Sequence, residues 1–163
     1  MSYEIIFWGN SSHSFMIFGI QKKAIIIMEG CGNRVSCRNL FKKLQILPLT
    51  SQYMLSLLML VVQNKNLFLT NNENHNLDTI QRNNLYLPQV TWTIYQKGTY
   101  YSGIKMFNNL PLGIKNVAGN QKKFKIALIN FLHIYSFYTI EECLRQSWIK
   151  NCITRFYYRG MLV

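Results

Sequence analysis

The sequence predicts a mainly α-helical fold, a small helical bundle interrupted by a long irregular loop rich in Asn. Apolar side chains recur at helical spacing in several segments that are bounded by Gly, Pro or a capping residue. Eight Asn occur between residues 64 and 84, where neither helical nor strand periodicity is present. The chain has 163 residues, of which 49% are hydrophobic, and this is enough for one domain with a modest core.

The first predicted helix spans residues 18–28. A polar Gln-Lys-Lys stretch at residues 21–23 precedes an apolar run that ends at Met28, and Gly30 follows as a stop signal. The apolar run contains three consecutive Ile residues. Because Ile is β-branched, a strand stays open as the alternative.

The second predicted helix, residues 37–47, has clearer boundaries. Ser36 can cap its N-terminus, and Pro48 ends it. The apolar side chains at helical spacing are Cys37, Leu40, Phe41, Leu44 and Leu47. The cations lie away from that stripe and are therefore expected at the surface, namely Arg38, Lys42 and Lys43.

The third predicted helix, residues 51–62, is apolar nearly all round. A globular protein tolerates such a helix only when several neighbours cover it. We therefore expect this helix to need partners that a short chain lacks. Its longest apolar run is half the length that a bilayer requires, so no membrane span is predicted.

The second half of the chain alternates loops and helices. Residues 64–94 form the Asn-rich loop, in which residues 85–94 are expected to be extended or to form a short strand around Pro88. Residues 99–109 form a helix before Pro111. Asn120 can cap a helix over residues 121–135. The face of this helix that is expected to pack inward comprises Phe124, Leu128, Phe131, Leu132 and Tyr135. Thr139 and Glu142 predict a capping box for a last short helix.

The charge balance limits the chemistry that this chain can perform. Its formal net charge is +12, from 18 Lys and Arg against 6 Asp and Glu, which suits a polyanionic partner. Two-metal chemistry on phosphates needs several convergent carboxylates, which six scattered acids do not supply. We therefore predict no catalytic residues and no polymerase, nuclease or integrase activity.

The remaining chemistry-bearing residues predict neither a metal site nor a cofactor. The cysteine spacings match no zinc knuckle or disulfide framework, so we expect free thiols at Cys31, Cys37, Cys143 and Cys152. No histidine forms part of a local catalytic signature, and a Cys–His pair assembled from distant positions is the open alternative. Glycine never falls into a phosphate-binding spacing.

Two sets of short motifs follow each other along the chain. The first comprises Tyr3, Trp8-Gly9-Asn10-Ser11, Gln21-Lys22-Lys23-Ala24-Ile25, Gly30, Arg34, Ser36-Cys37-Arg38, Leu40-Phe41-Lys42, Ile46-Leu47-Pro48-Leu49 and Ser51-Gln52-Tyr53. The second comprises Tyr95-Gln96-Lys97-Gly98, Tyr100-Tyr101-Ser102-Gly103-Ile104-Lys105, Phe107-Asn108-Asn109-Leu110-Pro111, Ile114-Lys115 and Lys123-Phe124-Lys125. In this order they resemble the region that follows the palm of jockey-like non-LTR retrotransposon reverse transcriptases.

This resemblance implies a truncated C-terminal remnant of an RNA-directed DNA polymerase, lacking the catalytic palm of a parent that also carries an endonuclease. It implies a thumb-like helical segment over residues 1–63, the Asn-rich loop over residues 64–94 and a C-terminal helical extension over residues 95–144. Residues 145–163 carry no likeness. We expect them to be an unrelated read-through tail that folding does not require.

The resemblance also implies sequence-independent contacts with RNA or DNA, in which cations neutralise phosphates. The cations that match the motifs are Lys22, Lys23, Arg34, Arg38, Lys42, Lys97, Lys105 and Lys125. Lys43 extends this set. The first turn of a predicted helix contains Lys122, Lys123 and Lys125. Positive charge at this end opposes the helix dipole, and a bound phosphate would neutralise it.

Other functions remain open at this point. The chain could be a helical protein-interaction module, including one that self-associates through a helix, or a peripheral membrane protein with apolar faces edged by Lys. Tyr95, Tyr100 and Tyr101 could stack on bases or belong to the core. With no signal peptide, we expect an intracellular location, in the nucleus or the cytoplasm.

Overall fold

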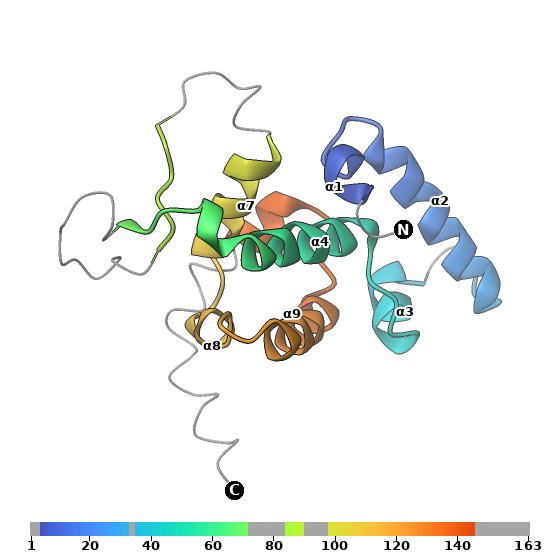
Figure 1. Ribbon diagram of the computed structural model, residues 1–163. Helices are drawn as coiled ribbons and strands as arrows, with labels where there is room; N and C mark the ends of the chain where they lie inside the picture. The colour runs from blue at the N-terminus through green and yellow to red at the C-terminus, as the bar shows by residue number, and fades with distance from the viewer. Residues whose placement is uncertain (1–3, 33–34, 72–83, 90–97, 146–163) are drawn as a thin grey trace, which may run out of the picture.

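The computed structural model describes residues 4–32, 35–71, 84–89 and 98–145 (Figure 1). This part of the chain is mainly helical and contains no strand, which confirms the predicted fold class at that level. The elements are α1 (Ile5–Trp8), α2 (Ser14–Met28), α3 (Cys37–Lys43), α4 (Leu49–Gln63), η1 (Lys65–Leu67), α7 (Thr99–Asn108), α8 (Leu112–Asn116) and α9 (Gln121–Tyr135). Residues 140–145 are also helical.

Helix α4 lies at the centre of the molecule, with α1, α2, α7 and α9 packed around it (Figure 1). Its side chains that are almost completely buried are Tyr53, Met54, Leu57, Leu58 and Val61. The expectation that this helix lacks cover within the chain is therefore wrong. The N-terminal helices and the helices beyond the Asn-rich loop supply the cover from both sides.

Two glycines allow backbones to approach α4 closely. A Cβ atom at Gly103 in α7 would lie 2.8 Å from Val61 Cγ2, and one at Gly9 would lie 2.5 Å from Tyr53 Cδ2. Both distances are well inside van der Waals contact, so a side chain at either position would force the neighbouring residue on α4 to move. Because glycine lacks this atom, the adjoining backbones pack directly against α4.

Helix α9 has the predicted bounds and cap. The Asn120 side chain accepts a hydrogen bond from Lys123 N (3.1 Å), as its predicted role as N-cap requires. The predicted inward face is confirmed at Phe124, Leu128 and Leu132, which are at most 1% exposed, whereas Phe131 and Tyr135 are half-buried. The helix ends at Ser136, whose φ of 48° is left-handed.

Helices α2 and α3 differ from their predicted bounds. Helix α2 begins four residues earlier, at Ser14, and α3 ends at Lys43 rather than at residue 47. Gln45 adopts a left-handed φ of 54°, and its side chain donates to Lys42 O (2.8 Å), which closes α3 early. Ser36 occupies the N-cap position of α3, but its side chain makes no capping hydrogen bond.

The Asn-rich loop is only partly described. In its described residues η1 follows α4, and one antiparallel bridge joins Thr70 to Leu85. The Asn108 side chain bonds both backbone groups of Leu85, donating to its O (2.7 Å) and accepting from its N (2.8 Å), so α7 anchors the extended stretch. The predicted irregular structure over residues 72–83 and 90–94 lies outside the described residues, as does the predicted tail from residue 146.

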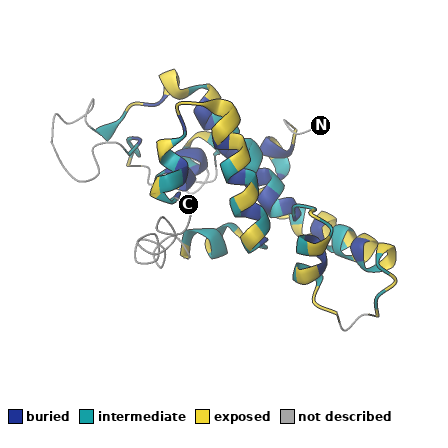
Figure 2. Ribbon diagram, turned by 90° about the horizontal axis from the view of Figure 1, so that it is seen from below, coloured by how far each residue is buried: buried dark blue, intermediate teal, exposed yellow. Residues whose placement is uncertain are grey.

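A single core joins the two helical segments on either side of the Asn-rich loop. Residues from α1, α2, α3 and α4 pack in one cluster with residues from α7, α8 and α9. Helices α2 and α3 form one end of this cluster, and exposed residues run along the outer side of α2 (Figure 2). The core is therefore built across a long sequence separation.

Candidate nucleic-acid interface

The structure distributes the predicted cations over four helices. Lys22 and Lys23 lie on α2, Lys105 lies on α7, and the others divide between two sets. The α3 set is Arg38, Lys42 and Lys43, and the α9 set is Lys122, Lys123 and Lys125. Arg34 and Lys97 lie outside the described residues. The cations differ sharply in what their charged groups already contact.

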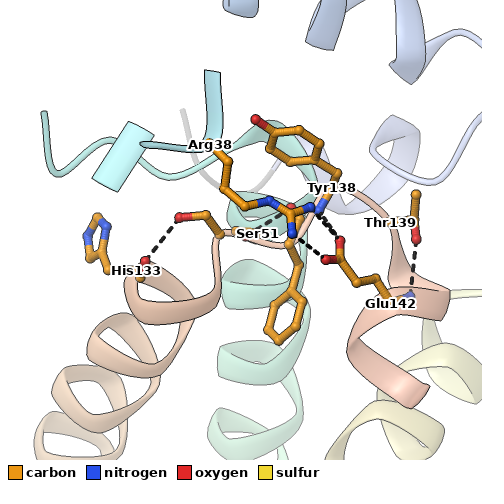
Figure 3. Close-up of polar contacts among 8 residues, drawn as sticks. Arg38, Ser51, His133, Tyr138, Thr139 and Glu142 are labelled. Carbon is orange, nitrogen blue, oxygen red and sulfur yellow. Dashed lines mark hydrogen bonds and ion pairs between the residues drawn. The ribbon is translucent and has the colours of Figure 1, made fainter. Parts of the chain in front are cut away.

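Arg38 is engaged within the protein. Its guanidinium pairs with the Glu142 carboxylate through two contacts, Nη1 to Oε1 at 2.8 Å and Nη2 to Oε2 at 3.1 Å (Figure 3). The same guanidinium lies over the Tyr138 ring, 4.5 Å from its centroid. The expectation that Arg38 is a free surface cation therefore needs correction, because an acid 104 residues away already holds it.

The Glu142 carboxylate also organises the turn that leads into the last helical segment. Its Oε2 atom accepts a hydrogen bond from Tyr138 N (3.0 Å), and Thr139 Oγ1 accepts one from Glu142 N (3.1 Å). One of the two hydrogen bonds of the predicted capping box is therefore present, the one that Thr139 accepts. The return bond goes to the N–H of Tyr138, one residue before the expected position. This acid acts as a cap and as the partner of Arg38 at once.

Tyr138 is the aromatic centre of the same cluster. The Lys22 ammonium lies 4.3 Å from the Phe18 ring centroid and 5.0 Å from that of Tyr138. The rings of Phe18 and Tyr138 meet edge to face, with their centroids 4.8 Å apart. Burial raises the pKa of the Tyr138 hydroxyl, and the positive charge of Arg38 opposes this shift. Lys22 and Arg38 thus hold the segment from Tyr138 to Glu142 against α2 and α3.

Lys43 also has an acidic partner. Its ammonium pairs with the Glu29 carboxylate, which follows the end of α2. The hydrogen bond to Glu29 and the negative charge of Glu29 raise the pKa of Lys43. This pair bridges the ends of α2 and α3 and leaves Lys42 as the α3 cation that has no ion pair among the described residues.

The α9 cations form the most open basic group. Lys122, Lys123 and Lys125 are exposed, and within the described residues none of them has an acid in ion-pair range. No acidic residue occurs in the first turn of α9. The apolar residue between them, Phe124, is completely buried against the core. The three ammonium groups are thereby carried on a rigidly packed turn.

Sequence reasoning did not single out Lys115. This half-buried lysine donates to Asn84 Oδ1 (3.1 Å) and to the carbonyl oxygen of Asn108. Burial lowers the pKa of its ammonium group. Lys115 follows Ile114 on the short helix α8, and nothing in the local sequence distinguishes it from an exposed lysine. Its role as a link between α8 and the extended stretch depends on tertiary packing.

The described residues offer little for metal or nucleophilic chemistry. Among them no three His, Cys, Asp or Glu residues lie close enough to hold a metal ion. Cys31, Cys37 and Cys143 form no disulfide, and Cys152 lies outside the described range. His133 is half-buried, and burial lowers the pKa of its imidazole. The exposed lysines can bind anions.

Comparison of the chain with protein-family models, with curated proteins and with solved structures finds no match. No helix in the described part of the chain has both the length and the apolar content needed to cross a bilayer. The candidate interface is therefore defined by its own geometry, as a group of three exposed lysines on the first turn of α9.

Proposed function

We propose that this chain is a non-catalytic remnant of the C-terminal region of a non-LTR retrotransposon reverse transcriptase that binds nucleic acid without sequence specificity. The ordered motifs along the chain support the origin. The single observation that carries the binding function is the group of exposed lysines at the start of α9, none of which pairs with an acid in the described part of the chain. Such a ligand would be met in the nucleus or the cytoplasm.

The binding mechanism is phosphate neutralisation. Three ammonium groups on one helical turn produce a local positive potential, and the N-terminal end of the helix dipole adds to it. Each phosphate that pairs with a lysine releases condensed counterions, which makes the affinity depend steeply on salt. Contacts of this kind position a nucleic acid and do not read its sequence.

A salt titration tests this proposal. A plot of log K against log salt has a negative slope. Replacement of Lys122, Lys123 and Lys125 by Gln should reduce the magnitude of this slope by about three, roughly one for each lost contact. The matched control removes the same charge elsewhere, through Lys23→Gln, Lys65→Gln and Lys105→Gln. Fluorescence anisotropy with a labelled RNA and a labelled DNA duplex measures both triple variants.

Comparison of the two triple variants shows whether binding depends on the α9 lysines or on the net positive charge of the whole protein. If the magnitude of the slope falls only in the α9 variant, the α9 lysines form the site. Equal changes in both variants would show that net charge alone governs binding. Arg38→Gln should leave the slope unaltered because Glu142 already occupies that guanidinium. If Arg38→Gln weakened binding as strongly as the loss of an α9 lysine, the assignment of the interface to α9 would be wrong.

The proposal includes the absence of polymerase and nuclease activity. Two-metal catalysis requires clustered carboxylates, and the whole sequence contains six acidic residues. Of these, Glu29 and Glu142 are held by Lys43 and Arg38. Purified protein should therefore show neither primer extension nor nucleic-acid cleavage with Mg²⁺ or Mn²⁺. Metal-dependent extension that persists through repeated purification would contradict the non-catalytic assignment.

A further inference from the structure

The outer side of α2 is apolar apart from Lys23, and no described segment of the chain covers it. Of the 15 residues in this helix, only Phe18 and Ile25 are buried. The opposite side, which we call the outer face, comprises Phe15, Met16, Ile17, Ile20, Lys23, Ala24, Ile27 and Met28. Ile20 is 66% exposed and Ile27 is 78% exposed. Monomeric proteins in water rarely leave so much contiguous apolar surface open.

The outer face is a continuous line along the helix. Met16, Ile20, Lys23 and Ile27 are separated by four, three and four residues, so they project in nearly the same direction. Helix α2 lies at the edge of the molecule, at the opposite end from η1 and α8 (Figure 1). The exposed side chains therefore meet whatever approaches this end of the protein along a helix about 22 Å long.

The charges on and around the outer face are positive. Helix α2 contains no acidic residue, and Lys23 lies within the apolar line. The acid that follows the helix, Glu29, is paired with Lys43 and only 13% of its side chain is exposed. The chain as a whole carries +12. An occupant of this face must therefore be apolar where the Ile residues meet it and anionic around Lys23.

We infer that the outer face of α2 binds the surface of an anionic lipid bilayer, with the helix lying in the plane of the headgroups. The apolar side chains would enter the acyl boundary, and the Lys23 stem would extend its ammonium to the lipid phosphates. The opposite side of α2 packs on the rest of the protein through Phe18, Ile25 and Gln21, so the protein body covers the side that an isolated interfacial helix would expose to water. This inference does not depend on the α9 lysines.

A second copy of the chain fits this face less well. Two outer faces related by a two-fold axis would bring the two Lys23 ammonium groups together near the centre of the contact, with no acid on α2 to separate them. They would also join two chains of charge +12. An anionic lipid surface removes both costs because it supplies the opposite charge.

Vesicle sedimentation tests the inference with the full chain. The protein should partition onto phosphatidylcholine vesicles that contain phosphatidylserine, and Ile20→Gln with Ile27→Gln should lower the partition coefficient roughly 100-fold. The matched control is Leu67→Gln with Leu112→Gln, at positions that are 71% and 64% exposed on η1 and α8. This control should change partitioning less than about twofold, because neither position lies on α2. Circular dichroism of each variant establishes that the helices are intact.

Three outcomes would overturn the inference. One is folded wild-type protein that stays in the supernatant with anionic vesicles. Another is equal binding by the Ile20→Gln/Ile27→Gln variant and its control, because adsorption would then come from net charge alone. The third is a dimer in sedimentation velocity that the Ile substitutions dissociate, which would assign the face to a second copy. Nucleic-acid affinity of the same variants should be unchanged, so failure here is distinguishable from failure of the α9 proposal.

Discussion

Helices α2 and α4 have the same length and opposite environments. Each has 15 residues and is predominantly apolar, yet α4 buries eight of them and α2 buries two. Neighbours surround α4, while α2 has neighbours on one side (Figures 1 and 2). An apolar helix thus requires cover, but its composition does not determine whether its own chain supplies that cover.

The difference arises from the order of the helices along the chain. Helix α4 follows the N-terminal helices and precedes α7 and α9, which return to pack on it from the other side of the Asn-rich loop. Its buried residue Ser51 donates to the carbonyl oxygen of Phe137 (3.3 Å), and Thr50 donates to that of Tyr138 (2.8 Å). No equivalent segment among the described residues returns over the outer face of α2.

The largest expected difference between the two helices is in side-chain truncation. Leu57→Ala in α4 should lower the free energy of unfolding by about 3 kcal/mol, because it leaves a cavity at a completely buried position. Ile20→Ala in α2 should change it by less than about 0.5 kcal/mol. Urea denaturation followed by circular dichroism measures both. An equally large loss for Ile20→Ala would mean that the outer face of α2 is covered in solution.

Replacing glycine by alanine should destabilise the protein in α7, where it packs on α4, and stabilise the protein in α2. Gly103→Ala places a Cβ atom 2.8 Å from Val61 on α4, and we expect a loss of about 1–2 kcal/mol from overpacking. Gly19 in α2 has no heavy atom within 4 Å of a built Cβ, so Gly19→Ala should stabilise by about 0.5–1 kcal/mol through helix propensity. Adding Val61→Ala to Gly103→Ala should recover part of the loss if the contact is responsible.

The pair of Arg38 and Glu142 should contribute less, because both side chains are partly exposed. A double-mutant cycle with Arg38→Gln and Glu142→Gln should give a coupling of about 0.5–1 kcal/mol that decreases with added salt. Thermal unfolding of the four proteins at two salt concentrations provides the measurement. A coupling that salt does not change would contradict its assignment to the ion pair, since the contact of Arg38 with the Tyr138 ring is lost in both arms of the cycle and cancels.

The smallest predicted effect concerns pH and the packed side of α9. Burial holds the pKa of His133 below its ordinary value of 6.5, so below that pH the unfolded chain binds more protons than the folded chain. The stability associated with neutral His133 is present above pH 6.5 and is lost as pH falls through the folded pKa. Unfolding of wild type and His133→Asn across this range should show a weaker pH dependence in the variant. Identical pH profiles would contradict the assignment.

Local sequence signals predicted the elements better than their ends. The periodicity of α9, its Asn120 cap and the helix over residues 99–109 correspond closely to the structure. The early end of α3 at Lys43 was not predicted, because it depends on the left-handed conformation of Gln45. Helix α8 was also missed, since Pro111 and Gly113 read as turn residues although Pro111 occupies the N-cap position of that helix.

The candidate interface could also be predicted only in part from the sequence. Counting residue types and their spacing identified the α9 lysines, and the structure leaves these exposed. The same reasoning could not separate them from Arg38 or Lys43, whose acidic partners lie on other elements. An ion pair between residues far apart in sequence has no local signature, so free and engaged cations look alike until the chain is folded.

The sequence by itself determined the helical character of this protein, its excess of positive charge and its shortage of carboxylates, because periodicity and composition are local or additive properties. Tertiary structure alone decided that α4 is central, that α2 keeps an open apolar face and that Glu142 holds Arg38. Burial and ion pairing depend on which distant segments meet. Two helices of similar composition can therefore have different neighbours.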